Sequence, residues 1–220
     1  MTIRPGPGSL AGLSAAAVAG ALALAPASAR GQSGSVAAQG AAATVSTVSA
    51  MQQVATAALT DTGGMADSEV ASVAVPNTLT AGGLASITTG QVDVALASAT
   101  TTAEAADVSV LGGVITAQSV LAVATSYANG TAATSESSGS TLVGLVVNGT
   151  SYGDVAPAPN TQIALPGVGM LVLNEQIPAG DGVHTTGLTV NMIHVYLTDP
   201  ALGTPAGDIV VGTAKTAATL

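Results

Sequence analysis

The stretch LTVNMIHVYL at residues 188–197 decides the fold class. Leu188, Val190 and Met192 alternate with polar residues in its first half, and apolar residues occupy both sets of positions towards its end. A period of two is typical of a β-strand, and a strand that is apolar on both sides is expected at the centre of a sheet. We therefore predict a central strand here.

The same period of two continues outside this stretch, from Asp67 onward. Turn residues such as Gly82-Gly83, Asn129-Gly130 and Asn148-Gly149 separate the alternating segments, and no long segment has a helical stripe. These features predict an all-β chain that folds as a compact antiparallel sandwich, with a β-solenoid or roll as the alternative. Further strands are predicted at residues 69–75, 92–97, 107–111, 114–125, 141–147, 161–165, 168–174 and 208–213.

The composition limits how such a sandwich can be stabilised. The chain has no Cys, Trp or Phe, and its apolar positions are mostly Val, Ala and Leu. Absence of cysteine excludes disulfides and Cys-ligated zinc. Because alanine contributes little on burial, we expect many short strands with small side chains, stacked closely.

The first 66 residues differ from the rest. Arg4, an apolar stretch at residues 10–25 and the triplet Ala27-Ser28-Ala29 predict a secretory signal peptide over residues 1–29. Residues 30–66 are rich in Ala, Gly, Ser and Thr, which predicts a poorly ordered leader with a short helix at Ser49–Leu59. A first strand is the alternative. The β-rich domain is then expected over residues 67–220.

The charge balance excludes one class of partner. With 12 acidic and 3 basic residues among 220, the chain has a formal net charge of −9 and cannot neutralise a run of phosphates. Nucleic-acid binding is therefore excluded, and no apolar segment predicts a permanent membrane span. Export without cysteine favours a bacterial envelope or exterior.

Several ordered motifs carry a resemblance to a known family. The chain resembles the choice-of-anchor P family of bacterial extracellular proteins, which implies a secreted, surface-associated β-rich domain with no general catalytic residue set. The chain departs from anchored members because it ends without an anchor motif. The motifs lie at residues 111–117 with Val120, then at 138–149, 165–176, 187–195 and 207–214.

Four residues are candidates for a metal site. Glu175, Asp181, His184 and His194 lie close in sequence, and imidazole and carboxylate suit zinc or a similar ion. The competing interpretation is that His194, in an alternating strand, is a hydrogen-bonded structural histidine.

Loop acids raise the question of calcium. Asp181 and Asp154 stand beside glycines and could supply oxygen ligands, although turn-forming aspartates are the favoured interpretation. Apart from this calcium alternative, no cofactor is expected. Asn129-Gly130-Thr131 and Asn148-Gly149-Thr150 match the glycosylation pattern, but we interpret both as hairpin turns with two residues at positive φ.

The sequence contains no catalytic constellation. It lacks a Gly-x-Ser-x-Gly elbow, a P-loop and a dinucleotide fingerprint. We therefore predict a non-catalytic, secreted structural or adhesive domain whose partners are envelope or extracellular components, or further copies of itself. The alternatives are a calcium-stabilised surface domain, or a secreted hydrolase or carbohydrate-binding module. The last would use Tyr152, Tyr196, Glu175 and Asp181 in one concave pocket.

Overall fold

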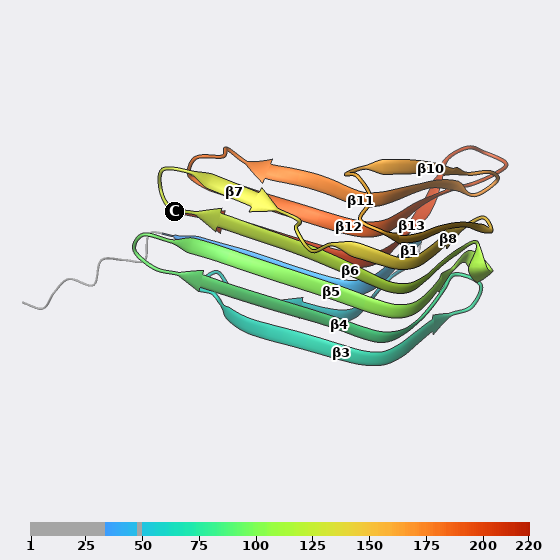
Figure 1. Cartoon of the computed structure of the whole chain (residues 1–220), viewed down its shortest axis with the longest axis horizontal. Helices are drawn as coiled ribbons and strands as arrows, with labels where there is room; N and C mark the ends of the chain where they lie inside the picture. The colour runs from blue at the N-terminus through green and yellow to red at the C-terminus, as the bar shows by residue number, and fades with distance from the viewer. Residues whose placement is uncertain (1–33, 48–49) are drawn as a thin grey trace, which may run out of the picture. The chain divides into compact units, whose positions relative to one another are not determined.

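The computed structural model describes residues 34–47 and 50–220, which form two antiparallel β-sheets stacked face to face (Figure 1). Apart from one short 3₁₀ turn, η1 (Leu111–Gly113), these residues contain no helix. The prediction of an all-β antiparallel sandwich is confirmed, and the solenoid alternative does not apply. The strands are β1 (Ser35–Thr47), β2 (Met51–Ala58), β3 (Gly64–Val75), β4 (Leu79–Val92), β5 (Ala97–Val110), β6 (Ile115–Ala128), β7 (Ala133–Glu136), β8 (Thr141–Val147), β9 (Thr150–Val155), β10 (Thr161–Leu165), β11 (Gly169–Gly180), β12 (Thr185–Thr198) and β13 (Pro205–Thr219).

Most strands pair with their neighbours in sequence. Sheet A has the order β10-β11-β12-β13-β1-β2, and sheet B has the order β3-β4-β5-β6-β8-β9, with β7 paired to β6. β1 has in addition a partner far away in sequence, because it lies between β2 and β13. Ser35 pairs with Thr219 and Thr47 with Gly207, so the first described strand joins the last.

The leader predicted for residues 30–66 is wrong over its described part. β1 and β2 fill much of this segment, and a strand, β2, replaces the helix expected at Ser49–Leu59. Small residues gave this segment the composition of a linker, but they are required here because the two sheets approach each other closely. A Cβ atom added to Gly40 of β1, for example, would lie only 2.0 Å from Ser86 Oγ of β4. The predicted signal peptide, residues 1–29, lies outside the described residues.

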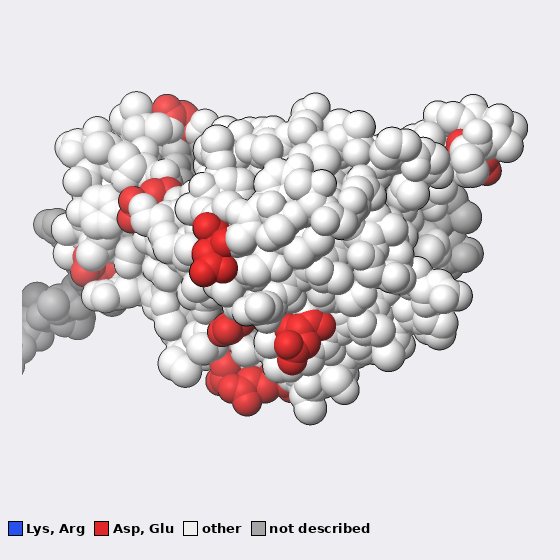
Figure 2. Space-filling view, turned by 45° about the vertical axis from the view of Figure 1, so that its right-hand side comes forward, with Lys and Arg blue, Asp and Glu red and all other residues white. Residues whose placement is uncertain are grey.

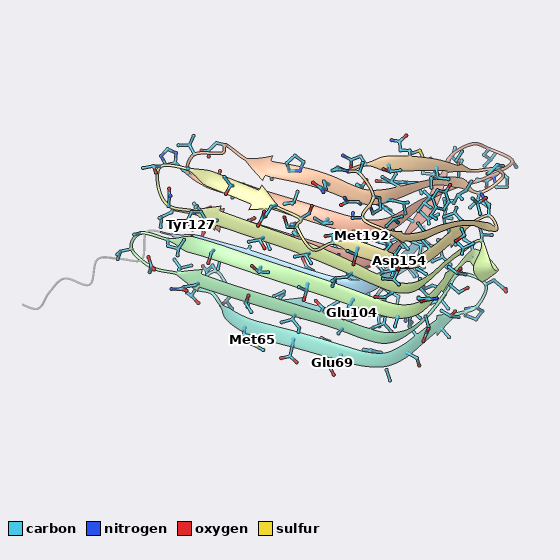
Figure 3. The ribbon with its side chains drawn as sticks, viewed as in Figure 1. Met65, Glu69, Glu104, Tyr127, Asp154 and Met192 are labelled. Carbon is cyan, nitrogen blue, oxygen red and sulfur yellow. The ribbon has the colours of Figure 1, made fainter. Side chains whose placement is uncertain are left out.

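The core between the sheets has two parts of different chemistry. The larger part contains Leu, Ile, Val and Met side chains, including the fully buried Ile115, Leu171 and Met192, the last labelled in Figure 3. The smaller part consists mainly of alanine. This second part agrees with the expectation of closely stacked strands with small side chains.

A chain of hydroxyl groups links the two sheets. Thr216 in sheet A lies 2.8 Å from Ser126 in sheet B, and Ser126 lies 2.8 Å from Ser135. Ser135 in turn lies 2.7 Å from Thr186, back in sheet A. Because each of these four hydroxyls has a hydrogen-bond partner, this group avoids the cost of burying unpaired polar groups.

A line of irregular positions, which we call the crease, crosses sheet A. It consists of Ala55, Asn174, Met192 and Gly212, of which Ala55 (φ 49°), Asn174 (φ 48°) and Gly212 (φ 72°) are left-handed. At each of these positions one pair is missing from the strand ladder, and the same register continues on both sides of the gap. Met192 and Ile193 are both fully buried, although adjacent side chains of a regular strand point to opposite faces. The crease therefore brings Asn191 and His194, three residues apart, onto the same outer face.

Sheet B contains comparable irregularities, where β3 to β6 bend in Figure 1. Gly83 (φ 53°), Asp107 (φ 49°) and Gly144 (φ 62°) are left-handed and lie within strands. The turn predicted at Gly82-Gly83 is therefore wrong: these glycines form a bulge inside β4, where the register with β5 shifts.

Candidate functional site

The candidate site is a group of polar side chains on the outer face of sheet A. It is formed by Glu175 of β11, by Asn191, His194 and Tyr196 of β12, and by Asp208 of β13, and we call it the Glu175 cluster. Strand register explains the grouping, because Glu175 pairs with Asn191 and Tyr196 pairs with Asp208. The crease adds His194 to the same face.

Glu175 is the acceptor at the centre of this cluster. Its Oε2 accepts hydrogen bonds from Asn191 Nδ2 and from His194 Nδ1, both at 2.7 Å, and its Oε1 accepts one from the Tyr196 hydroxyl. Burial raises the pKa of Glu175, but the hydrogen bonds from Tyr196, His194 and Asn191 together outweigh it, so the net pKa lies below its ordinary value. Glu175 is therefore an ionised acceptor.

Two neighbours hold this arrangement in place. Thr213 Oγ1 donates a hydrogen bond of 2.9 Å to Asn191 Oδ1, which orients the amide so that its nitrogen faces Glu175. Burial, followed by the hydrogen bond to Glu175 and the charges of Glu175 and Asp208, raises the pKa of Tyr196. Tyr196 therefore stays a neutral donor.

His194 has one bonded and one unbonded ring nitrogen. Since ionised Glu175 can only accept, Nδ1 of His194 carries a proton and donates it. Its Nε2 is buried without a hydrogen-bond partner, and Asp208 Oδ2 lies 3.4 Å away. The ring stacks on Tyr196 with 3.9 Å between ring centroids, and His194 is only 9% exposed.

The four predicted metal ligands do not converge. Glu175 contacts His194, whereas Asp181 and His184 form a separate pair, 3.7 Å apart, in the loop between β11 and β12. Six residues of extended strand separate Glu175 from Asp181, which corresponds to roughly 20 Å. Within residues 34–47 and 50–220 no group of three or more His, Asp or Glu side chains could hold a metal ion.

Both loop acids considered for calcium bond to the backbone. Asp181 Oδ1 accepts from the amides of Thr185, Val183 and His184 at 2.8–2.9 Å, and these bonds lower its pKa below the ordinary range. Asp154 lies in β9 and accepts from the Gly144 amide at 3.0 Å. Asp181 therefore has the geometry of a structural, turn-forming aspartate, whereas Asp154 links β9 to the left-handed Gly144 of β8.

The residues considered for sugar binding are scattered. Tyr196 and Glu175 are bonded, but Asp181 is in the loop described above and Tyr152 lies on β9 in the other sheet. A cavity of about 470 Å³ beside β7, β11 and β12 has a lining without charged side chains and includes Ser135, Asn160 and Gln176. None of the four residues belongs to that lining.

Sequence reasoning found Glu175 and His194 but missed Asn191 and Asp208 as their partners. The available signal was the pairing of the strands predicted at residues 188–197 and 208–213, which would have placed Asp208 beside Tyr196. The shift of Asn191 onto that face depends on the crease, and nothing in the alternating pattern indicates it.

Comparison with known proteins gives no match: no family model fits this chain, and neither a curated protein nor a solved structure is significantly similar to it. The resemblance to the choice-of-anchor P family therefore stays a prediction. Over the described residues, the structure also contains no helix long and apolar enough to cross a membrane.

Proposed function

We propose that this chain is a non-catalytic structural or adhesive domain that bacteria export to the cell surface or the medium. The observation that carries the proposal is that the acid and the imidazole of the Glu175 cluster are both held by neighbouring polar groups. Glu175 already accepts three hydrogen bonds, and the two ring nitrogens of His194 face carboxylates. Nucleophilic hydrolysis needs a hydroxyl bonded to the histidine, and within the described residues no hydroxyl bonds to His194.

The sheet edges support a discrete domain over an edge-to-edge polymer. In sheet B, edge strand β3 carries Asp67 and Glu69, and edge strand β9 contains Gly153 at φ 67°. In sheet A, edge strand β10 has only five residues, and edge strand β2 carries no charge but is interrupted by Ala55 at φ 49°. Charges, short length and bulges all oppose strand addition by another chain. The proposed contacts with envelope or extracellular components therefore use the sheet faces.

The surface is compatible with such contacts. Figure 2 shows acidic side chains scattered over one face, between wide areas without charge. On the outer face of sheet B, Glu69 and Glu104 are exposed (Figure 3) among neighbours such as Thr102 and Ala85. A surface of this kind suits neutral, polar partners better than nucleic acid or cationic ones.

Export is tested by expressing the whole chain in a bacterium and determining the N-terminus of the product by mass spectrometry. The expected result is protein recovered outside the cytoplasm that begins at Arg30. Protein that keeps Met1 and stays in the cytoplasm would overturn this part of the proposal.

Absence of catalysis is tested with panels of polysaccharide, ester and peptide substrates. We expect no turnover above that of a matched buffer control. An activity that is lost in Glu175→Gln or His194→Gln, but kept in His184→Gln, would replace the proposal with the hydrolase alternative. His184 is a suitable control because it is the other histidine, exposed and outside the cluster.

A further inference from the structure

We propose that the cavity beside β7 binds a neutral saccharide. This cavity, which we call the β7 groove, is lined by residues that include Ser135 of β7, Asn160 of the turn before β10, Gln176 of β11 and Thr186 of β12. The inference rests on the proposed function, because an exported domain meets the saccharides of the envelope or the medium, and it gives the partner a chemical class. It differs from the sugar site considered from sequence, whose four residues do not line the groove.

The groove exists because β7 covers sheet A only in part. β7 has four residues, is the last strand of sheet B at this end of β6, and contacts β12. β11 lies one strand beyond β12, so the inner face of sheet A is open near Gln176 and Pro178 (Figure 1). The opening has a volume of about 470 Å³, and small-molecule sites in proteins occupy about 300–1,000 Å³.

The first argument is a spare proton on Thr186. The chain of hydroxyls from Thr216 to Thr186 contains four protons but three hydrogen bonds. Thr216 is 1% exposed and its hydroxyl has no second partner among the described residues, so its proton has to enter the chain. Each hydroxyl then donates to the next, and the proton of Thr186, which is 8% exposed, is left without an acceptor. An oxygen of a ligand in the groove would accept it.

The second argument is that two amide groups of the lining are already oriented. Gln176 Nε2 donates to Ser137 Oγ at 2.7 Å and to Asn174 Oδ1 at 3.0 Å, which uses both of its protons and leaves Oε1 as an acceptor. Asn160 Oδ1 accepts from the backbone amide of Gln176 at 2.9 Å, which leaves Nδ2 as a donor. With the hydroxyl of Thr186, the lining offers two donors and one acceptor.

The third argument is the uncharged lining. Over the part of the chain that the structure describes, no charged side chain lines the groove, so an ionic ligand would lose hydration there without gaining an ionic contact. Saccharide hydroxyls both donate and accept, so adjacent hydroxyls can bond to Gln176 Oε1 and to the donors of Asn160 and Thr186. Pro178 and Leu188 supply apolar surface for the C–H groups of a sugar ring.

An extended peptide is the competing ligand, because β7 has one unpaired edge. The backbone amide of Ala133 points away from β6, since it donates to the Gly182 carbonyl at 3.1 Å. Backbone groups of alternate residues in a strand point the same way, so Ser135 also faces the groove. On the other side, Pro178 of β11 has no N–H to offer to an added strand. So few backbone groups favour a small saccharide over a strand.

The test is an NMR titration of the full chain with sugars of different charge. Glucose, galactose, mannose and N-acetylglucosamine are the neutral probes, and glucuronic acid and glucosamine are the charged ones. We expect at least one neutral probe to shift the amide signals of residues 133–135, 176–179 and 186–188 saturably. The charged probes should bind more weakly than their neutral counterparts.

Asn160→Asp tests the lining without removing the turn contact. The aspartate keeps an oxygen for the Gln176 amide, but it loses the Nδ2 donor. Loss of one neutral hydrogen bond should weaken saccharide binding about 2–12-fold. Asn148→Asp makes the same change in the exposed turn between β8 and β9, at the opposite end of β6, and should leave binding unchanged.

Thr186→Val removes the spare donor and keeps the shape of the side chain. It should weaken binding by a similar factor, whereas Thr189→Val, on the outer face of the same strand, should not. Circular dichroism verifies that each variant is folded. If Thr186→Val does not fold, Asn160→Asp decides the question, because Asn160 is exposed.

Three results would overturn the saccharide site. The first is that no neutral probe shifts these signals, and the second is binding that is unchanged in Asn160→Asp and in Thr186→Val. The third is binding of an acetylated trialanine amide by a groove that binds no saccharide, which would assign the groove to peptides. None of these results alters the location or the turnover of the exported chain, so failure of this site is distinguishable from failure of the proposed function.

Discussion

Glu175 is a charged residue in a largely buried position, and it is tolerated there because three donors face it. Burial of the Glu175 carboxylate alone would be unfavourable, but its hydrogen bonds to Asn191 and His194 connect β11 to β12. Removing it leaves the Asn191 amide, the His194 ring N–H and the Tyr196 hydroxyl without their acceptor. The losses at Asn191 and His194 cost more than the bonds themselves, because these buried donors must then remain unpaired, whereas the exposed Tyr196 hydroxyl can bond to water.

Glu175→Ala should therefore destabilise the fold. We expect a loss of about 2–4 kcal/mol in the free energy of unfolding, since each buried donor left unpaired costs about 1–3 kcal/mol. Urea unfolding monitored by circular dichroism measures this loss. Glu104→Ala is the matched control on the exposed face of sheet B, and it should change stability by less than about 0.5 kcal/mol. Equal effects of the two substitutions would contradict the assigned role of Glu175.

The hydrogen bonds of Asp181 determine how the stability of the fold should change with pH. Three backbone amides lower its pKa in the folded state below the ordinary value of 3.8. An aspartate whose pKa is lower in the folded state than in the unfolded state stabilises the fold at pH values above its unfolded-state pKa. This stabilisation is lost as the pH falls through the folded-state pKa. The wild type should thus be more stable than Asp181→Asn at pH 7, and the difference should shrink below about pH 4. Thermal unfolding at both pH values measures it, and a difference that grows in acid would refute the assignment.

At the scale of strands, the period of two located some elements well and others not at all. The strands predicted at residues 141–147 and 161–165 coincide with β8 and β10. The strand predicted at 92–97 is mostly a turn, because Asp93 Oδ1 accepts from the Ala95 amide and the Asp93 amide donates to the Leu96 carbonyl. Alternation alone does not distinguish a strand from a short loop in which polar residues bond locally.

β4 was missed because Gly82-Gly83 was interpreted as a turn, whereas three other missed segments share one cause. β1, β2 and most of β5 contain Ala, Ser and Thr, with few of the large apolar residues that reveal a strand. Their inward faces pack on another sheet at close range, so that small side chains serve there as the buried set. Turn chemistry was correct at one of the three named turns: Asn148 and Gly149 take φ values of 50° and 74° between β8 and β9, as predicted. At Asn129-Gly130, only the glycine has positive φ, because Asn129 instead accepts from the amides of Thr131 and Ala132.

Gly212 tests the importance of the crease. Its φ of 72° strains any other residue, and an added Cβ would lie 3.0 Å from Val120 Cγ1 and 3.4 Å from Ala122 Cβ. Gly212→Ala should cost about 2–3 kcal/mol, of which about 1–2 kcal/mol is backbone strain. Gly149→Ala isolates the strain, since its φ is 74° and nothing lies within 4 Å of the added Cβ. Chemical unfolding should show the larger loss for Gly212→Ala, and a reversed order would contradict tight packing at the crease.

For the whole molecule, the small side chains and the absence of cysteine belong together. Stability has to come from paired backbone groups and from two sheets in close contact, because neither disulfides nor large aromatic side chains are available. The hydroxyl chain from Thr216 to Thr186 adds polar links where the sheets are too close for larger side chains. Closely stacked sheets with small side chains can be predicted from the composition. The pairing of β1 with β13 cannot, since no local sequence pattern specifies which distant strand pairs with β1.

The position of β1 gives the most direct test of the fold as a whole. Because β13 lies on one side of β1 and β2 on the other, its amides should exchange with solvent as slowly as those of central strand β12. Hydrogen exchange measured by mass spectrometry should therefore show strong protection over residues 36–45. Complete exchange of this segment within the first time point would mean that it is the poorly ordered leader predicted from the sequence.

Truncation tests the same point by a different route. A chain that begins at Ala50 lacks β1, so β13 would expose an unpaired edge and β2 would lose the only strand with which it pairs. The interior would also lose buried Val36, Ala38 and Val45. Burying a valine contributes roughly 1.5–3 kcal/mol, so these contacts together approach the 5–15 kcal/mol by which an ordinary domain is stable. The shortened chain should show no cooperative thermal transition, while a chain that begins at Arg30 should unfold like the full protein. Cooperative unfolding of the chain that begins at Ala50 would show that the two sheets hold together without the strand that joins the ends of the described chain.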